Sequence, residues 1–195
     1  MPLPDRDIVR RRRSTVVPSN QVDFILYAYG EEFFDETTFQ SVDDLVRVIE
    51  QETSSSQRSF WIDVVNRSGV DIPDGIRLLC EHFDIHPLTI EDIGTLAPYM
   101  KLDLFTDQAA LYLLMKDIMW NGQRIEQQQL SFYLKCSKNL LITFRESCYS
   151  TDRSLFHPIR HRLRREPGSG DQHCRLRQLN VDYLLYCLLD DLVHR

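Results

Sequence analysis

The run from residue 83 to residue 93, FDIHPLTIEDI, constrains the local structure of this chain more than any other stretch. Pro87 has a fixed φ and no backbone N–H, so it suits the first turn of a helix and disfavours helical geometry at His86. The apolar residues before the run recur at helical spacing. The sequence therefore predicts that one helix ends near Asp84 and that a short second helix starts at Pro87.

The second helix is expected to point Leu88 towards the core and to carry two adjacent acids, Glu91 and Asp92, at its exposed end. Mg²⁺ prefers octahedral oxygen ligands and gives up its waters reluctantly, so proteins often hold it with only one or two carboxylates. Two adjacent acids are more often simply the solvated face of a helix. Taken alone, the residues favour that interpretation over a metal site.

The segment before this corner combines strand and helix patterns. Residues 22–29 alternate and are rich in aromatic and β-branched side chains, which predicts a strand, with residues 36–39 as its short partner. Ser41 is a candidate N-cap for a helix that ends in the polar loop 53–57. Residues 60–65 are apolar except for Asp63, which predicts a buried strand. A buried carboxylate needs a partner, and we expect Asp63 to cap a neighbouring helix rather than to bind a metal.

The segment after the corner predicts an antiparallel meander. The sequence Asn121-Gly122 favours a hairpin, because a type I′ turn requires positive φ at both central residues. The expected strands span residues 101–105, 109–120, 125–136 and 140–144. Together with the preceding helices, they predict an α/β fold with a mixed β-sheet layered between helices.

Three regions complete the expected domain organisation. Residues 1–21, with the basic block Arg10–Arg13, are expected to form a disordered tail, with binding to phosphate or to anionic lipid as the alternative. The α/β domain is expected over residues 22–174, including a basic helix at 152–166 and a linker at 167–170. A strongly helical pattern over 175–195 is the last element, and we interpret it as part of a longer helix.

Composition and charge exclude several classes of function. The chain has 23 basic and 29 acidic residues, a net charge of −6, which argues against general nucleic-acid binding. Its five cysteines form no CxxC pair and predict free thiols in a reducing compartment. No stretch approaches the roughly 20 consecutive apolar residues that a membrane helix needs, so this chain is not expected to cross a membrane by itself.

Motifs of catalysis are absent from the sequence, which has no G-x-S-x-G elbow, no Walker loop, no G-x-G-x-x-G and no H-E-x-x-H. His157 and His161 have the i, i+4 spacing that can bind zinc, but no third ligand has a fixed spacing from them. His82 and His86 share that spacing across the helix-breaking Pro87. We therefore expect no enzymatic activity, with an enzyme built on His157 and His161 as a minor alternative.

Four stretches, in order along the chain, resemble the soluble domain of the CorA family of divalent-cation transporters. They are FWID at 60–63, the central run FDIHPLTIEDI, LLITFRE at 140–146 and DYLLYCLLD at 182–190. The region that they span is about two thirds of the chain. The resemblance implies the same α/β fold, with residues 175–195 as the start of a long stalk helix that leads to the membrane.

The resemblance also implies a function and a site. In CorA-like proteins, five subunits assemble around a pore, and divalent ions bound between their cytoplasmic domains hold the closed state. One ligand is the aspartate of the Glu-Asp corner, which corresponds to Asp92 here, with Glu91 as its neighbour. This chain is thus expected to be the cytoplasmic, Mg²⁺-sensing domain of a homopentameric membrane transporter. The alternative is a stand-alone soluble binding module that has lost the channel part.

Some positions depart from the family pattern. A further family acid corresponds to Ser154, and the aspartate of the family's Phe-Asp-Pro-Val-Arg stretch corresponds to His157. The Val-Asp expected after the Tyr-Leu-Leu-Tyr run reads Val193-His194. These changes bear on the metal site and leave the expected fold as it is.

Overall fold

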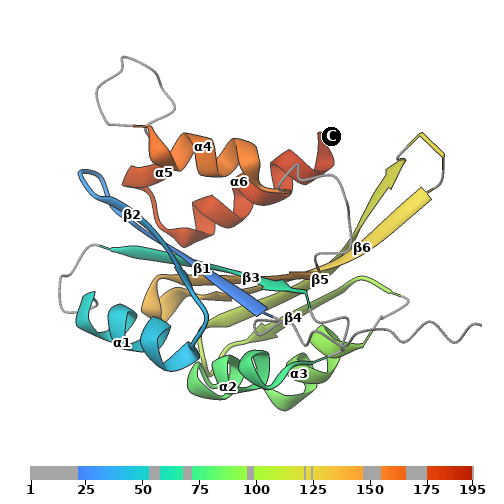
Figure 1. Cartoon of the computed structure of the whole chain (residues 1–195), viewed down its shortest axis with the longest axis horizontal. Coiled ribbons are helices and arrows are strands. Elements are labelled where there is room, and N and C mark those ends of the chain that lie inside the picture. Colours follow the sequence, from blue (N-terminus) through green and yellow to red (C-terminus); the bar gives the residue numbers. More distant parts are fainter. Residues whose placement is uncertain are drawn as a thin grey trace, which may run out of the picture.

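The structure, a computed structural model, describes residues 22–52, 58–67, 72–95, 99–120, 122–123, 125–146, 155–165 and 175–194. These residues form a seven-stranded mixed sheet with helices on both of its faces (Figure 1). The predicted α/β fold class is confirmed.

The strands follow the order β2-β1-β3-β7-β6-β5-β4 across the sheet. Their bounds are β1 Val22–Tyr29, β2 Phe34–Phe39, β3 Ser59–Asn66, β4 Lys101–Phe105, β5 Ala110–Trp120, β6 Ile125–Lys135 and β7 Leu140–Glu146. A short 3₁₀ turn, η1 (Cys136–Lys138), joins β6 to β7. The predicted strand at 22–29 and its short partner are confirmed, as is the meander from β4 to β7.

β3 and β7 lie side by side in the middle of the sheet and run parallel, whereas the other strand pairs are antiparallel. Every residue of β3 is buried, as predicted from its apolar sequence, because helices cover both of its faces. The predicted β5–β6 hairpin also forms, with Trp120 opposite Ile125. Gly122 has the positive φ of 93° expected in its turn, while Asn121 lies outside the described residues.

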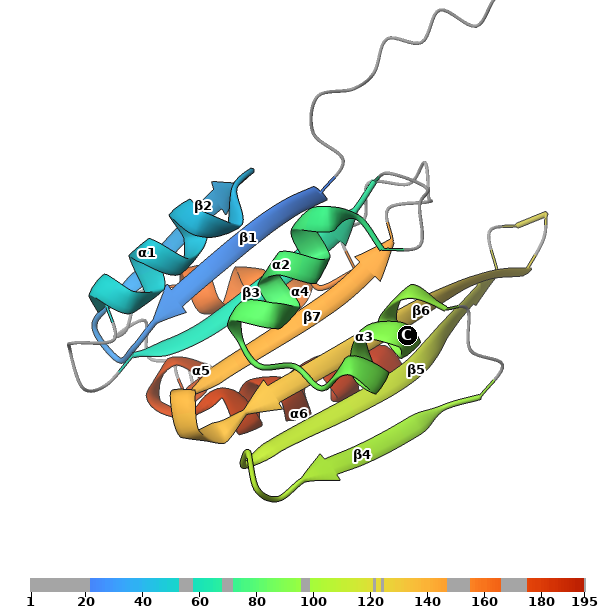
Figure 2. The same cartoon turned by 90° about the horizontal axis from the view of Figure 1, so that it is seen from below.

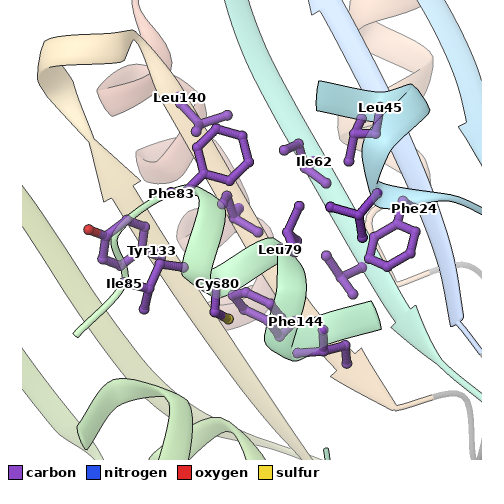
Figure 3. Close-up of a cluster of buried hydrophobic side chains, with 14 of the residues drawn as sticks. Phe24, Leu45, Ile62, Leu79, Cys80, Phe83, Ile85, Tyr133, Leu140 and Phe144 are labelled. Carbon is purple, nitrogen blue, oxygen red and sulfur yellow. The ribbon is translucent and has the colours of Figure 1, made fainter. Parts of the chain in front are cut away.

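Three helices cover one face of the sheet: α1 (Val42–Glu52), α2 (Asp74–His82) and α3 (Pro87–Gly94), seen in front of the strands in Figure 2. Side chains from α1, α2 and alternate strand positions fill the space between these helices and the sheet in one continuous cluster. Figure 3 shows this cluster, with Leu79 and Cys80 of α2 among Phe24, Ile62 and Phe144 of the strands.

The opposite face carries α4 (His157–Arg164), α5 (Arg175–Gln178) and α6 (Val181–Val193) (Figure 1). Their apolar side chains form a second cluster with the strands, in which the Trp61 ring stacks on Tyr27 at 4.5 Å between centroids. The helix predicted over 175–195 is in fact two helices, because Asn180 is extended with ψ 174°. The final helix, where the stalk was expected to begin, therefore starts at Val181.

The central corner forms as predicted, with α2 ending at His82 and α3 starting at Pro87. Asp84 takes a left-handed φ of 54° between them, and the buried Lys135 donates a hydrogen bond to the Phe83 carbonyl at 2.9 Å. His86 is the N-cap of α3, where its ring nitrogen Nδ1 accepts from the Leu88 N–H.

Two details of the sequence interpretation are wrong. Leu88 does not face the core: its side chain is 59% exposed, and Thr89 is buried in its place. Because the helix starts at Pro87, the position that faces the sheet is the third helical residue rather than the second. Asp63 does not cap a helix either, because its carboxylate is bound on its own sheet by Arg145 and Thr143 of β7.

Several expectations concern residues outside the described ranges: the tail with Arg10–Arg13, the loop 53–57, Ser154 and the linker 167–170. Of the described cysteines, Cys80, Cys136 and Cys187 are free thiols, as predicted, while Cys148 and Cys174 are outside the described part. Among the described helices, none combines the length and the apolar character needed to span a membrane.

Candidate functional site

Asp92 lies in the last turn of α3, against the edge of the sheet. Its side chain is only 15% exposed, and its Oδ2 atom accepts a hydrogen bond from Lys101 Nζ at 2.7 Å. Lys101 is also 2.9 Å from Asp103 Oδ2, so one ammonium group bridges two carboxylates. The three side chains together have a net charge of −1.

The alternation of β4 explains why these groups meet. Lys101 and Asp103 are two positions apart on the strand and therefore project to the same face, on which α3 lies. The intervening Leu102 projects to the opposite face and is 59% exposed. Hydrogen bonds to Asp92 and Asp103 raise the pKa of Lys101 above its ordinary value, so this lysine is charged throughout the physiological range.

Both ends of α3 are attached to the sheet. At its start, the His86 ring stacks on Phe105 of β4, with 5.5 Å between ring centroids. At its end, Gln129 of β6 donates hydrogen bonds to the backbone carbonyls of Asp92 and Thr95, each at 3.0 Å. The backbone of Asp92 is thus held in place by β6 independently of the contact of its side chain with Lys101.

Glu91, the second predicted site residue, is exposed. Consecutive helical residues do not face each other, so the side chains of Glu91 and Asp92 diverge. The structure therefore brings Asp92 together with Lys101 and Asp103, and it leaves Glu91 on the solvent side of the helix.

The histidines considered in the sequence are elsewhere. His157 and His161 stack on each other on α4 at 6.2 Å between ring centroids, on the opposite face of the sheet from α3. His82 is 3.8 Å from Glu50 of α1, and His86 caps α3, so these two do not form a common site. Across the described ranges, no three His, Cys, Asp or Glu side chains gather as a metal cluster would require.

The chemistry of the Asp92 region nevertheless fits a hard cation. Its donors are carboxylate oxygens, which Mg²⁺ prefers, and an ammonium cation already lies between them. Two carboxylates provide only part of an octahedral shell. An ion held here would keep several waters or take further oxygen ligands from another subunit.

The sequence analysis proposed Asp92 as a site residue but did not point to Asp103 or to the contact of Lys101 with both acids. The alternation Lys101-Leu102-Asp103 on a predicted strand already places the two charges on one face. What the sequence does not reveal is that α3 packs over that face, because this depends on how a helix and a strand that are separate elements come together.

Comparison with curated proteins gives two informative similarities. The chain is 31% identical over 138 residues to the cobalt/magnesium transport protein CorA of Thermotoga maritima, covering 71% of this chain and 35% of the relative. It is 29% identical over 136 residues to a protein of Schizosaccharomyces pombe named "Putative metal ion transporter", covering 68% of this chain and 19% of the relative. The chain thus spans only about a third or less of the length of these relatives. Both relatives are named as transporters rather than as enzymes.

Among solved structures, the full-length CmaX protein has the same fold over most of this chain. The superposition has a TM-score of 0.60 at 14% sequence identity, and it covers 92% of this chain and 47% of the other. No family model matches the sequence.

Proposed function

Because this chain carries the amino-terminal domain of a CorA-type transporter, we propose that it is the ion-sensing domain of a CorA-like transporter of Mg²⁺ or other divalent cations. The observation that carries the proposal is the similarity over 138 residues to a cobalt/magnesium transport protein. In this proposal, transport takes place in membrane segments outside this chain. The domain lies on the cytoplasmic side and reports the concentration of the ion to the pore.

Asp92 is the proposed ligand of the sensing ion, with Glu91 as a second, weaker candidate. The carboxylate of Asp92 has the right donor atoms, lies at the edge of the sheet and is carried on a helix that is attached at both ends. Such an ion would hold the carboxylate of Asp92 while taking its remaining ligands from water and from a neighbouring subunit. The ion supplies two positive charges that neutralise acids of both subunits.

Ion binding between subunits gives a mechanism for regulation. An ion that is bound only when two domains meet stabilises the assembled, closed arrangement by its differential binding to that state. When the ion concentration falls, the link that the ion makes between neighbouring subunits is lost and the arrangement loosens. We propose a homopentamer as the assembly, with α6 leading into the stalk.

The test is ion-dependent association of the chain 1–195. Its sedimentation is measured by analytical ultracentrifugation with and without Mg²⁺ or Co²⁺, and ion binding is measured by calorimetry. The wild-type chain is expected to bind the ion and to associate more strongly in its presence, whereas Asp92→Asn is expected to lose both properties. Asp107→Asn removes the same charge from the exposed β4–β5 turn and serves as the matched control.

Two outcomes would contradict the proposal. One is a wild-type chain that neither binds the ions nor changes its association, which would favour a binding module without a sensing role. The other is an ion response that Asp92→Asn leaves intact, which would place the sensing site elsewhere in the chain.

A further inference from the structure

The carboxylate that the proposed function assigns to the ion is already occupied by a cation of the chain itself. Lys101 Nζ lies 2.7 Å from Asp92 Oδ2 and 2.9 Å from Asp103 Oδ2, and the lysine and Asp92 side chains are only 27% and 15% exposed. A divalent ion that binds the same oxygen atom of Asp92 comes close to the ammonium group, and the two cations repel each other.

We propose that Lys101 is a tethered competitor of the divalent ion: it neutralises Asp92 when the ion is scarce and is displaced when the ion binds. Asp103, which shares the ammonium group, becomes the second carboxylate of the site. This inference rests on the proposed role of Asp92, and it adds one ligand and a mechanism that sets the affinity.

The chemistry of lysine suits such exchange. Its ammonium is a single charge on a flexible four-carbon stem, so it can leave the carboxylates by side-chain rotation without moving the strand. A divalent ion brings twice the charge but must lose part of its hydration shell. The two cations therefore compete closely, and the lysine lowers the affinity of the site into a range where the ion can exchange.

Displacement of Lys101 also changes how α3 is attached. The Lys101–Asp92 ion pair joins the end of α3 to β4, an edge strand that pairs only with β5 among the described strands. The bonds from Gln129 hold the backbone of α3 to β6 and do not involve Lys101. Ion binding thus replaces the lysine link between α3 and β4 by the ion itself, held by Asp92 and Asp103, while the helix stays in place and the remaining coordination positions of the ion face another subunit.

The experiment compares the ion affinity of variants of the chain 1–195, with Mg²⁺ and Co²⁺ titrated separately in a calorimeter. Lys101→Met leaves two carboxylates facing each other without a cation, so its affinity is expected to be about tenfold to a hundredfold higher than that of the wild type. Lys101→Arg keeps a cation and is expected to stay near the wild-type affinity. Lys138→Met removes the same charge from the exposed 3₁₀ turn and is the control.

A second substitution tests the role of Asp103. Asp103→Asn in the Lys101→Met background removes the proposed second ligand and is expected to reverse the gain in affinity. Thermal unfolding of each variant checks that it is folded, and Lys101→Gln, which retains a hydrogen-bond donor without a charge, replaces Lys101→Met if that variant does not fold.

The outcomes separate this inference from the proposed function. If the wild type binds the ion through Asp92 but Lys101→Met and Lys101→Gln bind no more tightly, sensing at Asp92 stands and competition by Lys101 is wrong. If Lys101→Met binds the ion through Asp92 while the wild type shows no binding, competition stands and sensing by the natural chain is wrong. If none of the variants binds either ion, both are wrong.

Discussion

Arg145 and Asp63 form a bidentate ion pair across the parallel contact between β7 and β3. Arg145 Nε is 3.0 Å from Asp63 Oδ1, and its terminal nitrogen is 2.9 Å from Oδ2. Asp63 is fully buried, and the Arg145 side chain is 13% exposed. Burial lowers the pKa of Arg145, but the attraction of the Asp63 carboxylate and the hydrogen bonds to it outweigh that effect and raise the pKa overall.

Removing the cation from this pair is expected to destabilise the protein strongly. Arg145→Met leaves the Asp63 carboxylate buried without a counter-charge, which costs about 3–5 kcal/mol of unfolding free energy. Denaturant unfolding measures the difference. Arg47→Met removes an arginine from an exposed ion pair with Asp44 and should change stability by about 0.5 kcal/mol or less. Equal losses for both variants would contradict a special role for the buried pair.

The acid sensitivity of the fold is expected to depend in part on Asp23. Burial raises its pKa, but hydrogen bonds from Arg67 at 2.7 Å and Gln40 at 3.0 Å outweigh burial and lower the pKa below 3.8. A carboxyl group with a lowered pKa in the folded state stabilises the fold fully above its unfolded pKa, and this contribution disappears as the pH falls through the folded value.

The stability advantage of the wild type over Asp23→Asn should therefore be constant near neutral pH and shrink below about pH 4. Denaturant midpoints of both proteins between pH 2 and pH 7 measure this advantage. The advantage of the wild type over Arg67→Met should shrink over the same pH range. A stability advantage of the wild type that grows as the pH falls would contradict a lowered pKa of Asp23 in the folded protein.

Two buried threonines are expected to respond in opposite ways to the same substitution. Among the described residues, the Thr89 hydroxyl has no hydrogen-bond partner, so Thr89→Val should stabilise the protein by about 1 kcal/mol. The Thr143 hydroxyl donates to Asp63 at 3.0 Å and accepts from Trp61 Nε1 at 3.1 Å. Thr143→Val should therefore destabilise the protein by about 1–3 kcal/mol. Thermal unfolding of both variants tests this pair, and a loss for Thr89→Val would reveal a partner for its hydroxyl.

Two residues with the same left-handed backbone are expected to differ when replaced by glycine. Asp84, at φ 54°, has an exposed side chain that makes a long ion pair with Lys135, 3.9 Å from Oδ2 to Nζ, so the backbone relief in Asp84→Gly should outweigh the lost ion pair and stabilise the protein by up to about 0.5 kcal/mol. Asn139, at φ 48°, binds the Arg58 carbonyl, the Ser59 hydroxyl and the Val181 N–H through its side chain. Asn139→Gly should therefore cost about 1–2 kcal/mol. Stabilisation by both substitutions would mean that the Asn139 contacts contribute little.

Much of the fold could be predicted because its signals are local. Pro87 marks the start of α3, the apolar run at 60–65 marks a strand buried on both faces, and Gly122 marks a hairpin. Each of these signals acts within a few residues. The placement of Leu88 was wrong because a short helix offers too few turns to fix which face meets the sheet.

The candidate site was predicted less completely, since it is built from residues of separate elements. Asp92 could be located from the corner motif, but its contact with Lys101 depends on how α3 lies over β4. The same limit applies to Asp63. The sequence predicted that this residue needs a partner, but it did not identify Arg145, which lies 82 positions away. Charge pairs between distant strands leave no periodic pattern in a sequence.

The parallel contact of β3 with β7 also joins two parts of the sheet that are far apart in the sequence, which bears on the order in which its strands pair. It pairs Phe60 with Leu140, whereas the strands on either side pair with close sequence neighbours. Closing the long loop between Phe60 and Leu140 costs more chain entropy than the shorter-range pairings on either side, so we expect the β3–β7 pairing to form after them. Until β7 has been synthesised, one edge of β3 has unpaired backbone groups, and these can pair with strands of other chains. Asp63 lies on that edge. A pairing strand without a cation would leave the Asp63 carboxylate buried and unpaired, which is costly. Asp63 therefore favours pairing with β7, which carries Arg145.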